Sequence, residues 1–224
     1  MNAAQAALDL RLYAIVDPEH AGGHDLAALA RAVAAGGATL VQLRDKLNDT
    51  RRMVEEARAL KAALAPFAVP LIVNDRLDVA LAAGADGVHL GQDDMAAADA
   101  RRILGPSALV GLSIRTPAQA AAAPLELLDY AGIGGVYATL SKARAQTPIG
   151  VCGLAGNVAI VRGRAAGFPV CGIAGITAAN AAEVVAAGAD GVAVISALSN
   201  GPDPQAAARA LRTAVDAARA GQAP

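Results

Sequence analysis

Short apolar runs alternate with alanine-rich segments along the whole chain. The apolar runs are rich in leucine and β-branched residues, which is typical of buried strands, and lie near residues 11–16, 39–43, 70–73, 87–90, 108–112, 130–137, 169–173 and 191–195. The segments between them favour helices, near residues 25–35, 50–64, 76–83, 95–104, 117–123, 154–166, 178–187 and 203–219. After Leu125 two alternatives stay open, because Leu127 and Leu128 can extend either a helix or a strand.

These eight strand–helix rounds predict a protein of the α/β class with a parallel sheet. Near-continuous apolar strands are typical of a sheet that is buried on both faces. Eight such units without a linker favour a closed barrel over an open sheet. We therefore predict a single (β/α)8 barrel, the TIM-barrel fold, as one domain over residues 1–224. Its short ends, at about 1–9 and 221–224, are expected to be flexible.

A short repeat marks one end of the predicted barrel. The sequence AAGADGV occurs at 82–88 and again at 186–192, and AAGGA at 34–38 is a looser copy. Each copy is typical of a helix C-terminus, a glycine cap and the entry into the next strand. Asp86 and Asp190 are therefore expected at the amino ends of strands, where structural roles dominate, and we exclude them from the functional site.

Composition narrows the class of protein. The chain has 224 residues, of which 55% are apolar and 17% charged, and its formal net charge is −1. This balance gives no broad basic surface for nucleic acid or an anionic membrane. An aromatic fraction of 2% argues against base-stacking platforms as well. Any recognition of phosphate must therefore be local, and we expect small-molecule substrates as partners.

The remaining global features point to an ordinary soluble protein. The N-terminus lacks the pattern of a signal peptide, and no apolar stretch has the length and flanks of a membrane span, so we expect a cytoplasmic location. Cys152 and Cys171 lie far apart without metal-ligand spacing and are expected to be reduced thiols. The oligomeric state stays open, and a homo-oligomer is compatible with the sequence.

Three polar side chains alternate at the end of the second predicted strand: Gln42, Arg44 and Lys46. Side chains two residues apart point to the same side of a strand. Arginine offers phosphate a forked donor and lysine offers a point charge, so the pattern predicts an anion clamp. A solvated loop rim after the strand explains this motif equally well.

Two aspartates follow the third and fourth predicted strands, on the face where such barrels carry active sites. Asp75 follows Asn74, and Asp94 follows Asp93. Asp75 alone is better explained as a helix cap, but two strand-end carboxylates on adjacent strands favour a metal. Oxygen ligands without a histidine or cysteine cluster indicate Mg²⁺ rather than Zn²⁺. Asp93 rivals Asp94 as a ligand, and Asp78 is a weaker candidate.

Two further residues lie on the fourth and fifth predicted strands. Ser113 ends the fifth strand with no base nearby in sequence, so we interpret it as a hydrogen-bond donor to substrate rather than a nucleophile. An ordinary loop hydroxyl is an equal alternative. His89 lies inside the fourth strand, which favours a packed, hydrogen-bonded histidine over a catalytic base.

The loops after the last three predicted strands suggest a second phosphate site. The loop after the sixth is long and polar, and its Thr139, Ser141 and Lys142 could hold a phosphorylated substrate, although a merely mobile loop fits too. Gly175 follows the seventh strand and Ser196 ends the eighth. Glycine lets backbone N–H groups approach an anion, and barrel phosphate sites commonly use these two loops. A plain tight turn is the alternative for Gly175.

Four motifs, in this order, resemble the thiamine-phosphate synthase family: VQLRDK at 41–46, VNDR at 73–76, DGVHLGQDD at 86–94 and VGLS at 110–113. The resemblance runs from about Tyr13 to Ala218. It implies a (β/α)8 transferase of thiamine biosynthesis that depends on Mg²⁺. Such an enzyme joins 4-amino-2-methyl-5-hydroxymethylpyrimidine diphosphate to thiazole phosphate, giving thiamine phosphate and pyrophosphate.

The same resemblance implies a role for each matching position. Asp75 and Asp94 would bind Mg²⁺. The pyrimidine diphosphate would be contacted by Gln42, Arg44, Lys46, Asn74, Ser113 and Lys142. The thiazole phosphate would be contacted by Thr139, Ser141, Gly175, Ile195 and Ser196. The groups expected to act in catalysis are Arg44, Lys46, Ser113 and Lys142.

Three positions on the thiazole side depart from the family pattern. Ser141 stands where the family usually has threonine, and Ala174 stands where it usually has the first glycine of a pair. The residue before Thr139 is alanine instead of the usual proline. Serine keeps the hydroxyl, and Ala174 adds only a methyl group, provided that its φ is negative.

The expected chemistry is dissociative. Pyrophosphate leaves the pyrimidine CH₂ while the 4-amino group feeds electrons into the ring, so no protein nucleophile is needed. Mg²⁺ and the cations Arg44, Lys46 and Lys142 would stabilise the departing charge. Two alternatives stay open: a thiazole-phosphate tautomerase of the same fold, and a non-catalytic protein that binds thiazole phosphate or thiamine phosphate. The predicted clamp and metal pair argue against the tautomerase, which needs neither.

Overall fold

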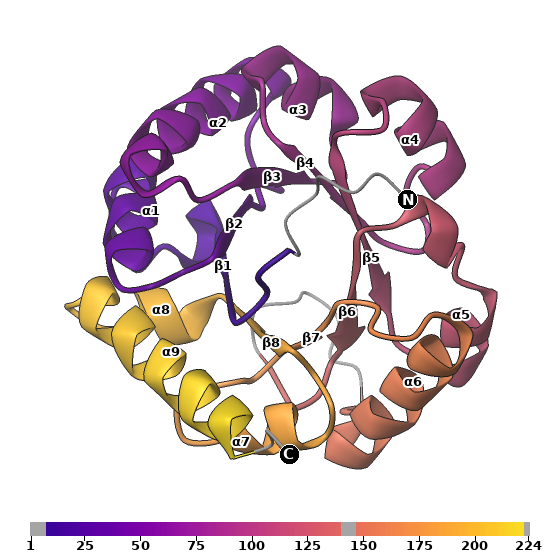
Figure 1. Ribbon diagram of the computed structural model, residues 1–224. Helices are drawn as coiled ribbons and strands as arrows, with labels where there is room; N and C mark the ends of the chain where they lie inside the picture. Colours follow the sequence, from indigo (N-terminus) through magenta and orange to yellow (C-terminus); the bar gives the residue numbers. More distant parts are fainter. Residues whose placement is uncertain (1–7, 140–146, 222–224) are drawn as a thin grey trace.

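The structure, a computed structural model, describes residues 8–139 and 147–221. Eight parallel strands form a closed barrel in chain order, and the last strand pairs with the first (Figure 1). The strands are β1 (Leu12–Val16), β2 (Leu40–Leu43), β3 (Leu71–Asn74), β4 (Gly87–Leu90), β5 (Leu109–Ile114), β6 (Tyr130–Gly134), β7 (Val170–Ile173) and β8 (Gly191–Val194). The predicted (β/α)8 barrel is confirmed. The predicted flexible ends fall mainly on 1–7 and 222–224, which lie outside the described residues.

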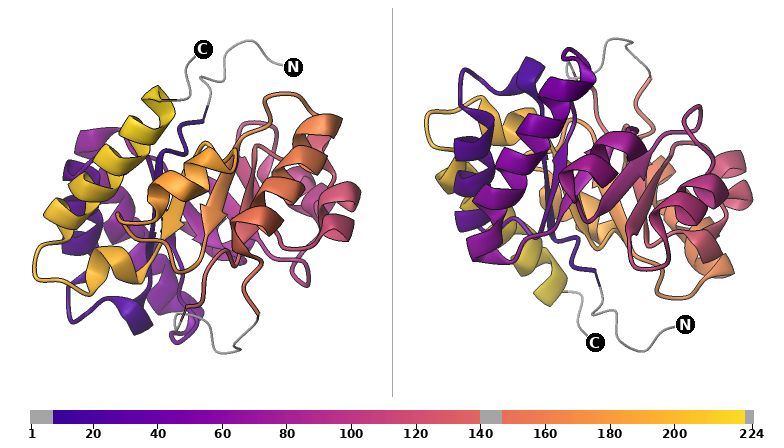
Figure 2. Two further views of the ribbon diagram at one scale, coloured as in Figure 1. Left: turned by 90° about the horizontal axis from the view of Figure 1, so that it is seen from below. Right: turned by 90° about the horizontal axis from the view of Figure 1, so that it is seen from above.

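Helices surround the barrel, and Figure 2 shows them flanking the strands in two further views. They are α1 (Leu26–Ala35), α2 (Thr50–Leu64), α3 (Leu77–Ala83), α4 (Ala97–Leu104), α5 (Pro117–Ala122), α6 (Gly150–Arg164), α7 (Ala181–Ala186), α8 (Ser196–Ser199) and α9 (Pro204–Ala220). The caps Asp25, Asp49 and Asp203 each accept a hydrogen bond from the first turn of a helix. Within the two described ranges, no helix combines the length and the apolar character needed to cross a membrane.

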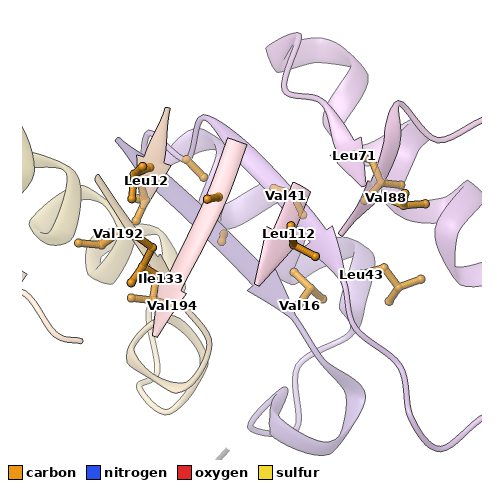
Figure 3. Close-up of a cluster of buried hydrophobic side chains, with 14 of the residues drawn as sticks. Leu12, Val16, Val41, Leu43, Leu71, Val88, Leu112, Ile133, Val192 and Val194 are labelled. Atoms are coloured by element: carbon orange, nitrogen blue, oxygen red, sulfur yellow. The ribbon is translucent and has the colours of Figure 1, made fainter. Parts of the chain in front are cut away.

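The strands are buried on both faces, as their apolar sequence predicts. Outward-pointing side chains such as Leu12, Val41 and Val88 belong to the layer between the sheet and the helices (Figure 3). A separate cluster of buried side chains fills the inside of the barrel, and Tyr13 and Tyr130 are its largest members. Buried tyrosine hydroxyls need hydrogen-bond partners, so this interior cannot be purely apolar.

One kind of hydrogen bond between a side chain and the backbone occurs four times at the amino ends of the strands, and we call it the amino-end contact. A polar residue that precedes each even-numbered strand accepts a hydrogen bond from a backbone N–H near the start of the preceding odd-numbered strand. The four pairs are Thr39 with Leu12, Asp86 with Leu71, Asp129 with Val110, and Asp190 with Val170. The placement of Asp86 and Asp190 at this end is confirmed, and their backbone contacts give them a structural role.

The predicted end of the sixth strand is wrong by a few residues. β6 ends at Gly134 rather than near residue 137. The chain nevertheless continues beside β7, because the N–H groups of Val136 and Tyr137 donate to the carbonyls of Ile173 and Ala174, at 2.9 and 3.1 Å. The apolar run of the sequence therefore extends beyond the regular ladder.

Other differences lie in the second half of the chain. Helix α6 begins at Gly150 rather than near residue 154, and Gly150 has a φ of +67° that is easy for glycine. The segment Leu125–Leu127 is a short 3-10 helix and so neither of the two open alternatives. The short helix α8 is not predicted from the sequence. Both cysteines are free, as expected, with Cys152 exposed and Cys171 buried.

Candidate active site at the carboxyl ends of the strands

A cavity of about 200 Å³ opens at the carboxyl ends of the strands, and residues from all eight strands or their following loops line it. The residues predicted from sequence that line this cavity are Gln42, Arg44, Lys46, Asn74, Asp75, Ser113 and Ile195. The structure thus brings together every described residue that was expected to contact the pyrimidine diphosphate. Lys142, which completes that expected set, lies outside the described residues.

Arg44 is held by a residue that sequence reasoning missed. Its guanidinium forms an ion pair with Asp17, whose side chain is 1% exposed just after β1. Asp17 also accepts a hydrogen bond from the backbone N–H of Glu19 at 2.9 Å. A charge-assisted contact to a buried, anchored carboxylate restricts the orientation of the guanidinium. Arg44 is therefore a positioned cation at the mouth of the barrel.

The loop around Asp17 also contains three potential metal ligands. Asp17, Glu19 and His20 form the one such group of three found within residues 8–139 and 147–221. His20 Nδ1 lies 3.4 Å from Asp17 Oδ1, while the other oxygen of Asp17 already binds Arg44. A metal ion at this group would have to compete with the guanidinium for a buried carboxylate, so we assign no metal to it.

Asp75 and Asp94 meet across the ends of β3 and β4. Burial raises the pKa of Asp75, and the neighbouring carboxylate of Asp94 raises it further, whereas Lys46 lowers it. Lys46 Nζ donates to Asp75, whose side chain is 15% exposed. Asp94 Oδ2 accepts a hydrogen bond from the N–H of Gly91 at 2.7 Å. Two carboxylates so close together favour the binding of a shared proton or of a cation. Lys46 supplies part of the positive charge that the pair requires.

The helix-cap explanation for Asp75 is wrong. The N-cap of α3 is Arg76, the N-cap of α4 is Ala96, and neither side chain makes a capping hydrogen bond. Asp75 instead lies in the turn before the cap, with a φ of +60°. Aspartate tolerates this left-handed conformation better than most residues. The turn directs its carboxylate to Lys46 and Asp94 rather than to a helix terminus.

The two rival aspartates take no part in this contact. Asp78 binds Arg76, with Nη2 and Oδ2 separated by 2.5 Å, and its side chain is 58% exposed. The pKa of Asp78 is lowered chiefly by its hydrogen bond with Arg76, as in an ordinary surface ion pair. Asp93 and Asp94 are both exposed, but it is the carboxylate of Asp94 that reaches Asp75.

His89 and Ser113 lie deeper in the cavity. His89 is 5% exposed and hydrogen-bonded, as its position inside β4 predicts. Its Nε2 lies 2.9 Å from the Oγ of Ser113. Sequence reasoning found no base near Ser113, because the two residues are 24 positions apart. A signal was available, since both residues are polar and sit at inward positions of adjacent parallel strands.

A second, smaller cavity lies on the β7 and β8 side of the mouth. Thr139, Gly175, Ile195 and Ser196 all line this space of about 30 Å³. Ile195 lines both cavities, so the two are neighbours. The structure therefore brings together the described residues that were expected to contact the thiazole phosphate. Ser141, the remaining member of that set, lies outside the described residues.

The backbone of this second side is more unusual than the sequence suggests. The condition of a negative φ at Ala174 is not met, since its φ is +86°. Gly175 follows with a φ of +65°, and a Cβ atom added there would lie 2.4 Å from the carbonyl oxygen of Ala138. Glycine would adopt the conformation of Ala174 without strain, which is consistent with the glycine pair that the family usually has there.

Known proteins match this chain over nearly its whole length. Residues 12–198 match the family described as thiamine monophosphate synthase. A thiamine-phosphate synthase from Xanthobacter autotrophicus is 52% identical, covering 94% of this chain and 98% of the relative. One from Agrobacterium fabrum is 48% identical, covering 94% and 96%. The solved structure of thiamine phosphate pyrophosphorylase from Pyrococcus furiosus has a TM-score of 0.82 at 34% identity, covering 94% of this chain and 98% of that one.

These matches agree with the resemblance inferred from the four sequence motifs. The family match begins at the first residue of β1 and ends inside α8, so it includes every strand of the barrel and both cavities at its mouth. This chain therefore belongs to the thiamine monophosphate synthase family.

Proposed function

We propose that this enzyme, a transferase that forms thiamine phosphate, joins 4-amino-2-methyl-5-hydroxymethylpyrimidine diphosphate to thiazole phosphate and releases pyrophosphate. The observation that carries the proposal is the division of the mouth into two sides. Arg44, Lys46 and Asp75 line the first side, while Gly175 and Ser196 line the second. A diphosphate with a metal ion suits the first side, and a monophosphate held by N–H groups and hydroxyls suits the second.

Asp75 and Asp94 are the residues that would hold Mg²⁺. The raised pKa of Asp75, which burial and the carboxylate of Asp94 cause, supports a site that favours added positive charge. One or two carboxylates, with water and substrate phosphate completing the shell, are the usual environment of Mg²⁺ in proteins. When bound, the ion neutralises negative charge on the diphosphate.

The clamp would act on the leaving group. The bond between the pyrimidine CH₂ and the diphosphate oxygen breaks, and its electron pair leaves with the diphosphate. Arg44, fixed by Asp17, and Lys46 would stabilise the developing charge on that oxygen. We extend the same role to Lys142. The 4-amino group stabilises the resulting pyrimidine cation, so the thiazole nitrogen attacks a carbon that no protein nucleophile has touched.

The second side would place the thiazole for this attack. The hydroxyls of Thr139 and Ser196, with the backbone of Gly175, would hold the phosphate. We propose that Ser141 also contacts this phosphate. Ile173 and Ile195 line both cavities, so apolar side chains separate the two phosphate sites. An apolar surface at the point of attack would keep water from capturing the cation before the thiazole does.

The test is release of pyrophosphate when the purified protein meets both substrates, with and without Mg²⁺. We expect release only with both substrates and the metal, together with one thiamine phosphate for each pyrophosphate. Pyrophosphate from the pyrimidine diphosphate alone would indicate a hydrolase. Rearrangement of thiazole phosphate alone would favour the tautomerase, and binding without turnover would favour a binding protein.

A further inference from the structure

Five polar side chains form a continuous hydrogen-bonded series across the inside of the barrel, which we call the polar relay: Gln42, Tyr13, Tyr130, His89 and Ser113. Gln42 Nε2 donates to the hydroxyl of Tyr13. The hydroxyls of Tyr13 and Tyr130 lie 3.0 Å apart. His89 Nδ1 lies 2.9 Å from the Tyr130 hydroxyl, and His89 Nε2 lies 2.9 Å from Ser113 Oγ. The relay therefore joins two of the residues proposed to contact the pyrimidine through three that are not.

The three middle members of the relay are almost fully buried. Tyr13 is 1% exposed, Tyr130 is 0% and His89 is 5%, and the two phenol rings pack edge to face with their centroids 5.8 Å apart. Burial raises the pKa of both tyrosines well above the usual value, so both phenols keep their protons. A buried hydroxyl that keeps its proton must donate it to a neighbour. The choice of donor and acceptor at one hydrogen bond of the relay therefore fixes the choice at the next.

This constraint gives the relay a direction. The amide N–H of Gln42 donates to the oxygen of Tyr13, so Tyr13 gives its proton to Tyr130 and Tyr130 gives its proton to His89 Nδ1. His89 then carries its own proton on Nε2 and donates it to Ser113 Oγ. The hydroxyl proton of Ser113 is left to point into the cavity. At the other end, Gln42 keeps its carbonyl oxygen as an acceptor.

We propose that Tyr13, Tyr130 and His89 are positioning residues that fix Gln42 as an acceptor and Ser113 as a donor, and so select an aminopyrimidine over the matching oxopyrimidine. The inference rests on the proposed function, because it assigns the ring of that substrate to this cavity. An amino group donates to Gln42 and a ring nitrogen accepts from Ser113. In the oxo ring the exocyclic oxygen faces the Gln42 carbonyl as a second acceptor, and the adjacent nitrogen carries a proton and cannot accept from Ser113.

The direction of the relay can be measured without any substrate. In ¹⁵N-histidine NMR of the whole protein near neutral pH, the signals of His89 are those that disappear in His89→Gln. We expect a neutral ring with the proton on Nε2 and an unprotonated Nδ1. A proton on Nδ1, or on both nitrogens, would mean that the relay does not run from Gln42 to Ser113, and the inference would be overturned.

The selectivity is tested by binding, since the amino group also contributes to the chemistry. Calorimetry with Mg²⁺ and without thiazole phosphate compares the 4-amino pyrimidine diphosphate with its 4-oxo counterpart. The intact protein should prefer the amino ring by on the order of 100-fold or more. Tyr130→Phe removes one link and should lower the preference at least tenfold. The matched control is Tyr137→Phe, which removes a tyrosine hydroxyl bound to Glu183 at 2.8 Å outside the relay, and it should leave the preference unchanged.

The outcomes separate this inference from the proposed function. An intact protein that prefers the amino ring but never releases pyrophosphate would sink the proposed function and leave the relay supported. Turnover with an unchanged preference in a folded Tyr130→Phe variant would sink the relay alone, as would an intact protein without preference. Binding of neither diphosphate would overturn both. If Tyr130→Phe fails to fold, the NMR measurement on the intact protein decides.

Discussion

The two ends of the barrel use aspartate in opposite ways. At the amino ends, Asp86, Asp129 and Asp190 each accept a backbone N–H and pair with a lysine or arginine at 2.7 to 2.9 Å. At the carboxyl ends, Asp75 faces the like charge of Asp94, and its pKa is raised by burial and by that neighbour. A carboxylate with complete partners stabilises the fold, whereas a crowded pair of carboxylates is arranged to receive a proton or a cation.

The largest expected effect is on Asp94 at the mouth. Asp94→Asn keeps the size of the side chain but removes one charge from the proposed metal pair. We expect kcat/KM for pyrophosphate release to fall by on the order of 100-fold or more, the scale of one lost preorganised electrostatic contact. The free energy of unfolding should stay level or rise, because repulsion with Asp75 is relieved. Kinetics and urea unfolding of the same variant measure both.

Two substitutions serve as controls for this result. Asp93→Asn changes the exposed neighbour and should leave activity and Mg²⁺ dependence intact. Asp190→Asn changes an amino-end aspartate and should lower stability while each folded molecule keeps its activity. Normal activity in a folded Asp94→Asn protein would contradict the metal assignment, and an equal loss in Asp93→Asn would shift the assignment to the turn as a whole.

The next effect is on stability at the amino ends. Asp129 accepts the N–H of Val110 at 2.7 Å and pairs with Arg101 at 2.7 Å, where both side chains are less than one fifth exposed. Asp129→Ala leaves both donors without this partner and should lower the free energy of unfolding by about 2 kcal/mol. Urea unfolding measures the loss. A fall in kcat beyond the folded fraction would show that this end of the barrel is coupled to the site.

The sequence predicts the amino end of the barrel better than the mouth, for a physical reason. Burial on both faces makes each strand apolar, and the copies of AAGADGV place Asp86 and Asp190 from local pattern alone. Their partners are the backbone N–H groups of Leu71 and Val170, which every chain offers at the start of a strand. This backbone contact, unlike the ion pairs with Lys61 and Arg162, can be predicted without knowledge of distant side chains.

At the mouth, the candidate site is built from contacts between distant parts of the chain. Arg44 is 27 residues from Asp17, and Ser113 is 24 from His89, so spacing does not reveal either pair. Strand periodicity does indicate which polar residues point inward, as Tyr13 does. Once the strand order is known, the inward polar positions of neighbouring strands are the first candidates for contact. The positive φ of Ala174 has no comparable signal, because alanine is common in every kind of segment.

A second carboxylate pair, Asp45 and Glu56, sharpens the comparison. Asp45 accepts hydrogen bonds from the N–H groups of Leu47 and Asn48, at 2.8 and 3.0 Å, and so holds the loop that carries Lys46. Burial raises the pKa of Glu56 above its ordinary 4.5, against the effect of Arg52, and the carboxylate of Asp45 adds to the rise. Asp45 of this pair accepts three hydrogen bonds from its own loop, whereas Asp75 and Asp94 lie at the open mouth of the site and accept one each from Lys46 and Gly91.

This second pair predicts a pH effect with a definite sign. Because the pKa of Glu56 is higher in the folded than in the unfolded state, the free energy of unfolding falls as pH rises from about 4.5 through the raised value. Glu56→Gln cannot lose a proton and can donate permanently to Asp45. The variant should therefore gain stability over the parent across that range, reaching about 1 kcal/mol above it. A constant difference in urea unfolding at every pH would contradict the raised pKa of Glu56.

The smallest expected effect concerns Thr39, the one uncharged side chain among the four amino-end contacts. Thr39 Oγ1 accepts the N–H of Leu12 at 3.2 Å and donates to its carbonyl at 3.1 Å, where the other three positions use a charged carboxylate. Neutral hydrogen bonds of this length contribute less than charge-assisted ones. The backbone bond from the Thr39 N–H to Leu12 O, at 2.8 Å, also survives a change of side chain. Thr39→Ala should therefore lower the free energy of unfolding by only about 0.5 kcal/mol, measured beside Asp129→Ala in the same urea series. A loss as large as that of Asp129→Ala would mean that the charge of the acceptor adds no stability. The amino-end contact would then stabilise the fold by holding β1 and β2 together.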